Sequence, residues 1–326
     1  MNILITGISG FSGSHLAEYL LNKEMTFKIF GTIRGRCRQT SFIDHIKDKL
    51  TLLECDLTDY NSVYTTIEES QPDWIFHLAA QSFVPTSWRA PQETINTNVL
   101  GTLNLLEVTR KSSLPIKIMI AGSSEEYGYV SSRELPINED NQLRPLSPYA
   151  VSKVTQDLLG YQYYKSYGMN IVRTRAFNLV GPRSGEKIVT AAFAKQIVNI
   201  EKEDSRYKGN SGITHKLKVG NMDTTRDFND VRDIVRAYHL VMKMGKAGEV
   251  YNICSEKGYS IRDIIKIYSK LTNSRFEISI DKDKYRPSDV PILIGDSRKF
   301  RKLTGWKLEI TFEQSLKDVL NYWRNQ

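Results

Sequence analysis

"ITGISGFSGSHL", residues Ile5–Leu16, is the stretch that decides the fold. The apolar run Asn2–Ile5 leads into it and predicts a short buried strand, and Ser14–Leu21 has the apolar spacing of a helix. Three glycines lie between the two, each three residues from the next: Gly7, Gly10 and Gly13. Glycines at a strand-to-helix turn let the backbone approach a pyrophosphate, which rests on the N-terminus of the helix. The stretch therefore predicts a dinucleotide-binding βα unit.

Strand-like and helix-like segments continue to alternate through about residue 180. This alternation predicts an α/β fold, a doubly wound parallel sheet of the Rossmann type with right-handed crossovers. We expect residues 1–180 to form the dinucleotide-binding domain, with a return of the chain near 229–254, and residues 181–326 to form a smaller α/β substrate-binding lobe. The ligand should lie at the carboxyl ends of the strands, between the lobes.

The composition is that of an ordinary globular protein of 326 residues, 40% apolar and 25% charged. The net charge of +8 comes without the clustered Lys and Arg of a nucleic-acid reading motif, so no nucleic-acid partner is expected. Part of the basic excess can serve a phosphate-rich small molecule. No apolar run approaches the ~18 residues that span a bilayer, and no secretory signal is recognisable, so we expect no membrane association.

Cysteine and histidine patterns bear on compartment and metal content. Cys37, Cys55 and Cys254 show no paired spacing, which fits a reduced cytosol. The five histidines show no metal-ligand spacing. The sequence therefore predicts a cytoplasmic protein with no metal site, in which the cysteines are structural.

The end of the predicted second strand bears on the choice of cofactor. Phe27–Gly31 is followed by "TIRGR", where an NAD-specific site usually has an Asp or Glu that accepts from the ribose 2′-hydroxyl. No carboxylate stands there, since Thr32, Arg34 and Arg36 are neutral or cationic. Because cations suit a 2′-phosphate, the segment predicts a preference for NADP, with NAD as the alternative.

A Tyr-x-x-x-Lys arrangement lies in "LSPYAVSK", residues Leu146–Lys153. Ser147 can cap a helix and Pro148 suits its first position, so Tyr149 should lie in the first turn with Lys153 one turn later. We expect the ammonium and the helix N-terminus to lower the pKa of the tyrosine from about 10. Such a tyrosine can take the proton from a sugar hydroxyl while hydride leaves the carbon.

The polar segment "SSEEYG", Ser123–Gly128, follows the apolar run Ile116–Gly122, which predicts a buried strand. Ser123 ends that strand and can hydrogen-bond the same sugar oxygen as the tyrosine. Since neighbouring residues of an extended segment face opposite sides, we expect Glu125 to face the cleft and Glu126 to point away.

These motifs resemble those of the extended short-chain dehydrogenase/reductase family, which carries TGxxGxxG at its amino terminus. The likeness continues in "CDLTD" (Cys55–Asp59), "HLAAQ" (His77–Gln81) and "NTNVLGTLNLLE" (Asn96–Glu107). The resemblance implies cofactor contacts at Gly7, Gly10, Phe11, Ser12, Gly13, Thr32, Arg34, Asp56, Leu57, Leu78, Ala79, Ala80, Tyr149 and Lys153. It also implies a homodimer through helices at Thr97–Arg110 and Pro148–Tyr167.

Within that family, a polar residue and a Glu directly after the catalytic Ser or Thr resemble the sugar-nucleotide 4,6-dehydratases. "SSEEYG" is similar to the Thr-Ser-Glu segment of GDP-mannose 4,6-dehydratases, with Ser123 for Thr. The resemblance implies that Tyr149 and NADP oxidise C4 of the hexose, and that Glu125 then removes the C5 proton. Ser124 or Glu125 helps water to leave C6. We therefore interpret the chain as a GDP-hexose 4,6-dehydratase, acting on a GDP-mannose or GDP-N-acetylglucosamine type of substrate for surface glycans.

Over almost its whole length the chain is at least as similar to GDP-4-keto-6-deoxy-mannose reductases, through "SSEEYG", "LRPLSPYAVSK", "VGNMDTTRDFNDVRDIV" and "YRPSDVPILIGD". Those enzymes use Ser, Tyr and Lys with NAD(P)H to reduce C4 and need no C5 base, so this reaction stays open as the alternative. Mannose dehydratases have an Arg-Lys pair where this chain has Ala191 and Ala192, which argues against GDP-mannose itself. A non-catalytic dinucleotide sensor is a distant alternative, because the triad Ser123, Tyr149 and Lys153 is intact.

The carboxyl-terminal half supplies most of the substrate contacts that the resemblance implies. They are Gln81, Asn178, Lys195, Asn221, Arg226, Arg286 and Asp289. By resemblance, Lys195, Arg226 and Arg286 hold the diphosphate, and Asp289 holds the ribose of GDP. Arginine suits phosphate because its fork donates two bonds in one plane. We also expect an amphipathic helix over Arg226–Met242 and a polar loop near the site over Ile200–Lys218.

Overall fold

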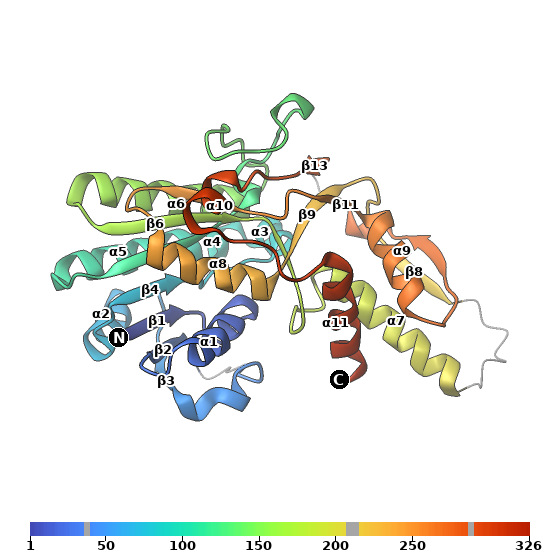
Figure 1. The fold of residues 1–326 in the computed structure, drawn as a ribbon, viewed down its shortest axis with the longest axis horizontal. Helices are drawn as coiled ribbons and strands as arrows, with labels where there is room; N and C mark the ends of the chain where they lie inside the picture. Colours follow the sequence, from blue (N-terminus) through green and yellow to red (C-terminus); the bar gives the residue numbers. More distant parts are fainter. Residues whose placement is uncertain (36–39, 207–214, 286–289) are drawn as a thin grey trace.

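A computed structural model describes residues 1–35, 40–206, 215–285 and 290–326. Its centre is a sheet of seven parallel strands in the order β10-β6-β5-β4-β1-β2-β3 (Figure 1). The strands are β1 (Asn2–Thr6), β2 (Lys28–Ile33), β3 (Leu50–Glu54), β4 (Trp74–His77), β5 (Lys117–Ser123), β6 (Asn170–Ala176) and β10 (Val250–Ile253). The order reverses between β1 and β4, which marks the point where doubly wound sheets bind ligands. The predicted fold class is confirmed.

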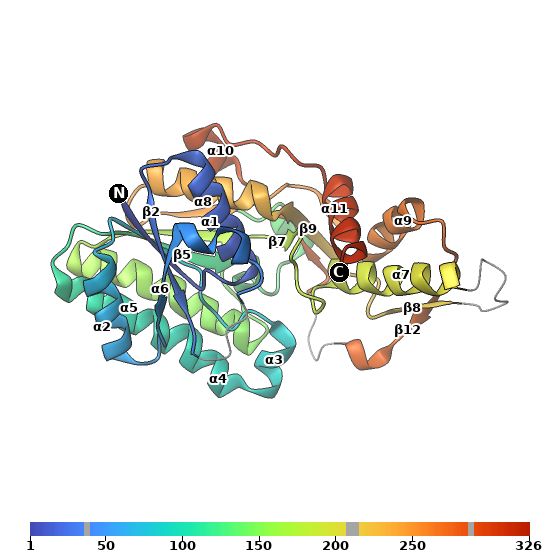
Figure 2. The same ribbon diagram turned by 90° about the horizontal axis from the view of Figure 1, so that it is seen from below.

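Helices cover both faces of this sheet, α1, α8 and α10 on one side and α2, α5 and α6 on the other (Figure 2). They are α1 (Phe11–Lys23), α2 (Tyr60–Ser70), α5 (Gly101–Ser112), α6 (Pro148–Tyr167), α8 (Val231–Met244) and α10 (Arg298–Thr304), with the short α3 (Val84–Arg89) and α4 (Pro91–Ile95) after β4. Leu16 and Leu20 of α1 and Ile234 and Val241 of α8 are fully buried in one cluster with strand residues. Each such side chain contributes ~1.5–3 kcal/mol by burial.

The second lobe lies at the other end of the molecule and is built around β9 (Figure 1). Its elements are β7 (Asn178–Val180), β9 (Thr225–Asp230), β11 (Gly258–Ser260), β13 (Ile292–Leu293), β8 (Lys216–Val219), β12 (Glu277–Ile280), α7 (Val189–Arg206), α9 (Ile261–Leu271) and α11 (Phe312–Arg324). Phe193, Ile264 and Leu316, one from each helix, meet in its core. None of the helices in the described ranges is long and apolar enough to cross a membrane.

The segment Arg226–Met242 is not one helix, so that prediction is wrong over its first five residues. These residues belong to β9, and α8 begins at Val231. Asp230 marks the change, because its carboxylate accepts a hydrogen bond from the backbone N–H of Arg232 at 2.8 Å, as an N-cap does. The charged side chains of β9 are buried within the lobe, contrary to the exposed polar face that a helix would need.

The loop predicted over Ile200–Lys218 is also corrected. Helix α7 continues to Arg206 because Phe193, Ile197 and Ile200 keep the helical spacing of its buried face. Strand β8 begins at Lys216. Residues 207–214 lie outside the described residues.

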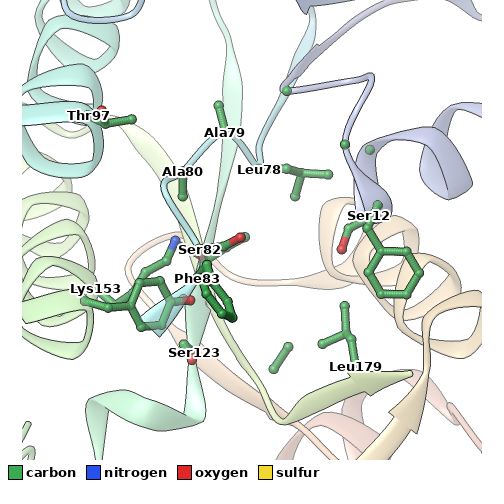
Figure 3. Close-up of a pocket in the computed structure, with 18 of the residues that line it drawn as sticks. Ser12, Leu78, Ala79, Ala80, Ser82, Phe83, Thr97, Ser123, Lys153 and Leu179 are labelled. Carbon is green, nitrogen blue, oxygen red and sulfur yellow. Dashed lines mark hydrogen bonds between the residues drawn. The ribbon is translucent and has the colours of Figure 1, made fainter. Parts of the chain in front are cut away.

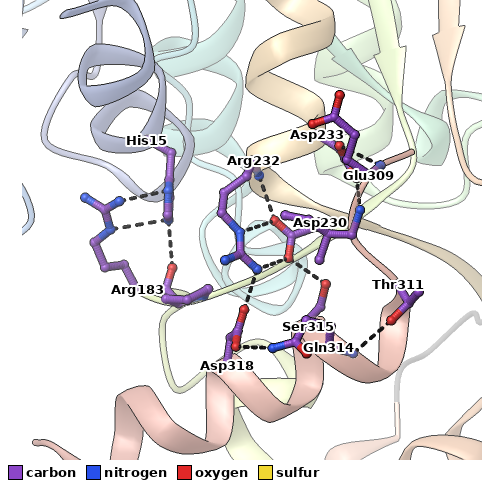
Figure 4. Close-up of polar contacts among 12 residues, drawn as sticks. His15, Arg183, Asp230, Arg232, Asp233, Glu309, Thr311, Gln314, Ser315 and Asp318 are labelled. Atoms are coloured by element: carbon purple, nitrogen blue, oxygen red, sulfur yellow. Dashed lines mark hydrogen bonds and ion pairs between the residues drawn. The ribbon is translucent and has the colours of Figure 1, made fainter. Parts of the chain in front are cut away.

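Two sets of polar contacts tie the lobes together (Figure 4). Arg183, just before α7, donates to Glu18 of α1 at 2.5 Å and to the ring of His15. Arg232 of α8 donates to Asp230 and, at 2.7 Å, to Asp318 of α11. Because both sets join α1 or α8 to the second lobe, they fix the lobes around the space between them.

Candidate active site

A cavity of about 610 Å³ opens at the carboxyl ends of the central strands, and residues of both lobes line it. This is a volume typical of ligand pockets. Figure 3 shows Leu78, Ala79 and Ala80 after β4, Ser12 at the start of α1, and Lys153 and Ser123 around one space. Among the described residues, no cluster of side chains could hold a metal ion.

The glycine turn after β1 leaves room for a ligand to approach its backbone closely. Gly7 has a φ of +70°, and a Cβ there would lie 3.0 Å from the Cα of Ala79. A Cβ on Gly13 would lie only 2.3 Å from the Gly7 carbonyl oxygen. No side chain of the described residues caps the start of α1, so its N–H groups are available to a phosphate. The turn therefore fits a dinucleotide pyrophosphate. All five predicted residues of the turn line the cavity: Gly7, Gly10, Phe11, Ser12 and Gly13.

Four further residues predicted to contact the cofactor line the same cavity: Thr32, Arg34, Asp56 and Leu57. Asp56 accepts hydrogen bonds from the backbone N–H and the hydroxyl of Thr58 at 2.9 and 2.8 Å. The first of these bonds is the main cause that lowers the pKa of Asp56. Arg34 lies 3.8 Å from the same carboxylate with its side chain largely exposed, and Leu57 lines the wall. Thr32 is buried and its hydroxyl accepts from the N–H of Gly7 at 3.0 Å, so it supports the turn.

Arg36, the second cation predicted for a 2′-phosphate, lies outside the described residues. Arg34 alone therefore carries that prediction within the described part of the chain.

The predicted triad comes together at the junction of β5 and α6. Ser147 caps α6 by accepting from the backbone N–H of Ala150 at 3.1 Å, which places Tyr149 in the first turn. Ser123, at the end of β5, lies close enough to the Tyr149 hydroxyl to lower its pKa. Lys153 donates to the backbone carbonyl of Ala121 at 2.8 Å. All three triad residues line the cavity.

The expectation of a lowered tyrosine pKa is wrong. Burial raises the pKa of Tyr149 above its usual value, the neighbouring Ser123 lowers it, and the negative charges of Glu125 and Glu126 raise it. The physical reason is that the ammonium of Lys153 bonds to a backbone carbonyl while the tyrosine itself is almost fully buried. Burial lowers the pKa of Lys153 to about 8, and Glu126 acts in the opposite direction.

The two glutamates of "SSEEYG" face different surroundings. Glu125 lines the cavity, and its backbone N–H donates to Ser123 Oγ at 3.2 Å. Glu126 is fully buried, as the prediction that it points away requires. The cause is not strand alternation but a single helical turn at Ser124–Glu126, which directly follows β5. Ser124 is buried and also lines the cavity.

Gln81, predicted to touch the substrate, holds the loop after β4. Its backbone N–H donates to Asn98 Oδ1 at 2.7 Å, and its Oε1 accepts from the backbone N–H of Phe83 at 2.6 Å. Asn98 in turn donates to Ser152 of α6 at 2.8 Å. This chain of bonds fixes the loop against the helix that carries Tyr149. Gln81 is not among the described residues that line the cavity.

The predicted residues of the second lobe are placed unequally. Asn178, the first residue of β7, lines the cavity. Lys195 forms an ion pair with Glu186 and lies over the ring of Trp323. Arg226 is buried and donates to the Val290 carbonyl at 2.6 Å, and Asn221 accepts from the backbone N–H of Asp223. The described lining of the cavity includes none of Lys195, Asn221 and Arg226. Arg286 and Asp289 lie outside the described residues.

Sequence reasoning missed Lys187 and Phe83, which both line the cavity. The ammonium of Lys187 lies 5.3 Å from the centre of the Phe83 ring, so the two span the cavity between the lobes. The only signal for Lys187 was a cation in a short polar turn before α7. Tyr238 of α8 also lines the cavity, although its spacing is that of a core residue.

A parallel sheet with a glycine cradle, and with Ser, Tyr and Lys gathered at its carboxyl edge, assigns this chain to the extended short-chain dehydrogenase/reductase class. The sequence model described as GDP-mannose 4,6 dehydratase matches residues 4–319. The chain therefore belongs to the GDP-mannose 4,6-dehydratase family.

Individual relatives agree with this assignment. The chain is 31% identical over 325 residues to GDP-6-deoxy-D-mannose reductase of Pseudomonas aeruginosa, with 99% of this chain and 97% of that protein covered. It is 32% identical over 356 residues to GDP-mannose 4,6-dehydratase of Yersinia enterocolitica, with 97% and 92% covered. The solved structure of RMD from Pseudomonas aeruginosa complexed with NADPH matches with a TM-score of 0.83 at 32% identity, covering 100% of this chain and 99% of that one.

Proposed function

We propose that the protein is a nucleotide-sugar 4,6-dehydratase that converts a GDP-hexose, of the GDP-mannose or GDP-N-acetylglucosamine type, into a GDP-4-keto-6-deoxy sugar. The observation that carries this proposal is the position of Glu125, which lines the cavity next to Ser123 and acts electrostatically on Tyr149. A dehydratase needs a base at C5, and a reductase does not. Family membership supports the GDP-sugar class.

The triad handles the proton of the C4 hydroxyl. Tyr149 takes this proton, while Ser123 donates a hydrogen bond to the same oxygen. C4 remains a ketone in the product, so the proton that Tyr149 gives back at the end goes to C5, after hydride has returned to C6. Ser123 opposes the rise that burial causes in the pKa of Tyr149 and so favours the tyrosinate that this step requires. When bound, the nicotinamide cofactor supplies the hydride chemistry at C4 and C6.

The glutamate then carries out the elimination. A ketone at C4 acidifies the C5 proton, and Glu125 removes it. The electron pair of the C5–H bond forms a C5=C6 double bond while the C6–O bond breaks. Ser124 or the protonated Glu125 donates to the departing oxygen, which leaves as water. Both residues line the cavity, as this sequence of steps demands.

For the cofactor we propose NADP in preference to NAD. The glycine turn, Asp56, Leu57 and Leu78–Ala80 would hold it, and Arg34 would face a 2′-phosphate. The NADPH in the structure of the Pseudomonas aeruginosa relative supports this preference. An affinity for NAD at least tenfold higher than for NADP, measured on the purified protein, would reverse it.

For the substrate we propose contacts from both lobes. Asn178 and Lys187 line the cavity and can donate to the sugar or the diphosphate. The family resemblance supports further contacts at Gln81, Lys195, Asn221, Arg226, Arg286 and Asp289. We retain the division into a dinucleotide-binding domain at 1–180, with a return near 229–254, and a substrate-binding lobe at 181–326.

A second candidate is reduction of a GDP-4-keto-6-deoxy sugar at C4. The observation that favours it is the raised pKa of Tyr149, because a protonated tyrosine is the form that donates to a ketone oxygen. The similarity to GDP-6-deoxy-D-mannose reductase over almost the whole chain supports it too.

The stoichiometry of the cofactor separates the two reactions. The protein is incubated in deuterated water with a trace of NADP and either GDP-mannose or GDP-N-acetylglucosamine. Dehydration gives a 4-keto-6-deoxy product with deuterium at C5. Glu125→Gln abolishes it, whereas the exposed control Glu68→Gln leaves it unchanged. If neither hexose reacts while a GDP-4-keto-6-deoxy sugar oxidises NADPH one for one, the protein is the reductase.

We further propose that the protein acts as a cytoplasmic homodimer in the synthesis of surface glycans. Along α6, the side chains of Val151, Leu158 and Tyr161 are 42–53% exposed. Ile95 and Leu100, which precede α5 in the sequence, are exposed as well. A second copy would cover these apolar side chains. Leu158→Asp should therefore convert a dimer into a monomer in light scattering. Free, buried Cys55 and Cys254 fit a reducing compartment.

A further inference from the structure

His77 is a buried histidine at the end of β4, and both of its ring nitrogens are hydrogen-bonded. Nδ1 lies 2.9 Å from the hydroxyl oxygen of Thr6, at the end of β1, and Nε2 lies 2.8 Å from that of Thr102 in α5. All three side chains are at most 2% exposed. The steps proposed for the reaction do not use this histidine, so its two buried bonds need another explanation.

The bonds of Thr6 determine which atom in its pair with His77 gives the proton. The Thr6 hydroxyl oxygen accepts hydrogen bonds from the backbone N–H groups of Leu78 and Ala79, both at 3.1 Å. These two bonds occupy both lone pairs of that oxygen. The hydroxyl proton therefore goes to His77, so Nδ1 is the acceptor and carries no hydrogen.

The other ring nitrogen leads to the same conclusion independently. The Thr102 hydroxyl donates to the backbone carbonyl of Asn98 at 2.6 Å, and its oxygen accepts from the side-chain amide of Gln156 at 2.5 Å. Because this hydroxyl has given its proton to Asn98, it can only accept from His77, so Nε2 carries the hydrogen. His77 is therefore the neutral Nε2–H tautomer. In agreement, burial and then the charge of Lys153 lower the pKa of His77 to about 3.

The loop that Thr6 holds forms part of the cavity wall. Leu78 and Ala79 both line the cavity (Figure 3). Ala79 also packs closely on the glycine turn, since a Cβ on Gly7 would lie 3.2 Å from the backbone nitrogen of Ala79. A shift of these amides would therefore also disturb the turn that fits the pyrophosphate.

We propose that His77 is a positioning residue for the cofactor. As the Nε2–H tautomer, it keeps the Thr6 hydroxyl in the one orientation that fixes the backbone amides of Leu78 and Ala79. If that hydroxyl turned to another acceptor, at least one of the two amides would lose its bond. The inference rests on the proposed function only in that this wall binds the nicotinamide dinucleotide.

Two substitutions separate the roles of the two ring nitrogens. Asparagine carries its amide oxygen at the δ position, as histidine carries Nδ1, so His77→Asn keeps an acceptor for Thr6 and loses the bond to Thr102. Glutamine carries its amide at the ε position, so His77→Gln keeps a donor for Thr102 and loses the acceptor for Thr6. The two variants thus differ in the contact that the proposal needs.

The functional measurement is the affinity for NADPH, followed through its fluorescence. His77→Gln should weaken binding roughly tenfold, the value of about one hydrogen bond, whereas His77→Asn should stay within about threefold of the wild type. The affinity for GDP, measured by calorimetry, should be unchanged in both. His239→Gln makes the same change in a buried histidine that is not among the described residues lining the cavity, and it should bind NADPH as the wild type does.

Three results would overturn the proposal. They are an equal loss of NADPH affinity in the two His77 variants, no loss in His77→Gln, and a parallel loss of GDP affinity, which would indicate a general disturbance of the fold.

A second measurement needs no cofactor. In protein with isotope-labelled histidine, nuclear magnetic resonance should show the hydrogen of the His77 ring on Nε2 and none on Nδ1, with the signals assigned by their loss in His77→Asn. A hydrogen on Nδ1, or a mixture of the two tautomers, contradicts the proposal. If the wild type binds neither NADPH nor NADH, the proposed cofactor is wrong, and the spectrum still decides whether His77 orients Thr6.

A second pair of variants covers the case in which the His77 variants do not fold. Thr6→Ser keeps the hydroxyl, whereas Thr6→Val keeps the shape of the side chain and removes the hydroxyl. The affinity for NADPH should stay within about threefold of the wild type in Thr6→Ser and fall roughly tenfold or more in Thr6→Val, which leaves two amides without their acceptor. Equal affinities of these two variants would show that the Thr6 hydroxyl does not position the wall.

Discussion

The two walls of the cavity are built in different ways. On the dinucleotide side, the proposed contacts stand at the ends of buried strands, such as the backbone turn at Gly7 after β1 and the hydroxyl of Ser123 at the end of β5. On the substrate side, they come from side chains on a three-residue strand and an exposed turn, Asn178 and Lys187. The position of the first wall is therefore set by the strands of the central sheet, whereas that of the second depends on how side chains are directed. Chemistry should be sensitive to the first wall and substrate affinity to the second.

The largest expected effect tests the chemistry of the dinucleotide wall. Tyr149→Phe removes the proton-transfer group and keeps the ring, so turnover should fall by roughly 10²–10⁴-fold. The affinity for the cofactor, measured through the fluorescence of NADPH, should change little. Turnover within threefold of the wild type would exclude Tyr149 from the reaction. The expectation that the chemistry depends on the dinucleotide wall would then be wrong.

The next effect tests the substrate wall. Lys187→Ala should raise the KM for the GDP-sugar by roughly 10–150-fold with kcat nearly unchanged, because one charge-assisted bond is worth ~1.5–3 kcal/mol. Lys195→Ala should raise it less, since Lys195 is paired with Glu186. The exposed Lys266 of α9 supplies the control variant.

A binding measurement sharpens this comparison further. If Lys187 contacts the diphosphate, Lys187→Ala should weaken the binding of GDP measured by calorimetry and leave the binding of guanosine unchanged. Equal losses of GDP affinity in Lys187→Ala and Lys195→Ala would mean that both lysines bind the diphosphate. A loss in Lys195→Ala alone would mean that the diphosphate binds to Lys195 of α7 and not to Lys187.

The glycine turn offers a third, smaller effect. Gly13→Ala places a Cβ about 2.3 Å from the Gly7 carbonyl, so the turn must shift. Overpacking of this kind costs about 1–3 kcal/mol, and we expect NADP affinity to fall by roughly tenfold or more. Gly185→Ala, in the substrate-side turn, meets nothing within 4 Å and should bind NADP as the wild type does. Equal affinities of the two variants would mean that the turn does not touch the cofactor.

The same contrast explains what sequence can predict. The βα turn, the cap Ser147 and the Tyr149–Lys153 spacing are local, so short-range rules placed them at the cavity. Lys187 was missed because its position depends on how the second lobe folds back, which no local pattern encodes. β9 was mistaken for helix because its charged residues are buried by pairing between distant segments, such as Arg226 with the Val290 carbonyl. Tyr149 was assigned the wrong direction of pKa shift because burial depth is not a local property either.

The last and smallest effect concerns acid stability. Burial lowers the pKa of His77 to about 3 and of His15 to about 4, and both lie in the dinucleotide-binding half. In the unfolded chain both imidazoles have a pKa near 6.5. Below that pH they are therefore protonated in the unfolded state but remain neutral in the folded state. Stability should thus be complete above pH 6.5 and fall as the pH drops toward 4, by about 1.4 kcal/mol per histidine for each pH unit.

His77→Gln tests this prediction. His77 bonds to Thr6 and Thr102 at 2.9 and 2.8 Å, and a glutamine can replace one of these bonds without titrating. Urea unfolding at pH 7.5 and 5.5 should show a smaller loss of free energy in the variant than in the wild type, even if the variant is less stable at pH 7.5. Hydrogen exchange at pH 5.5 should accelerate first in β1 and β4, which carry Thr6 and His77, and not in α9 or α11. If hydrogen exchange accelerates first in the second lobe, the dinucleotide side of the cavity is not the acid-sensitive part of the protein. The structural difference proposed between the two walls would then be wrong.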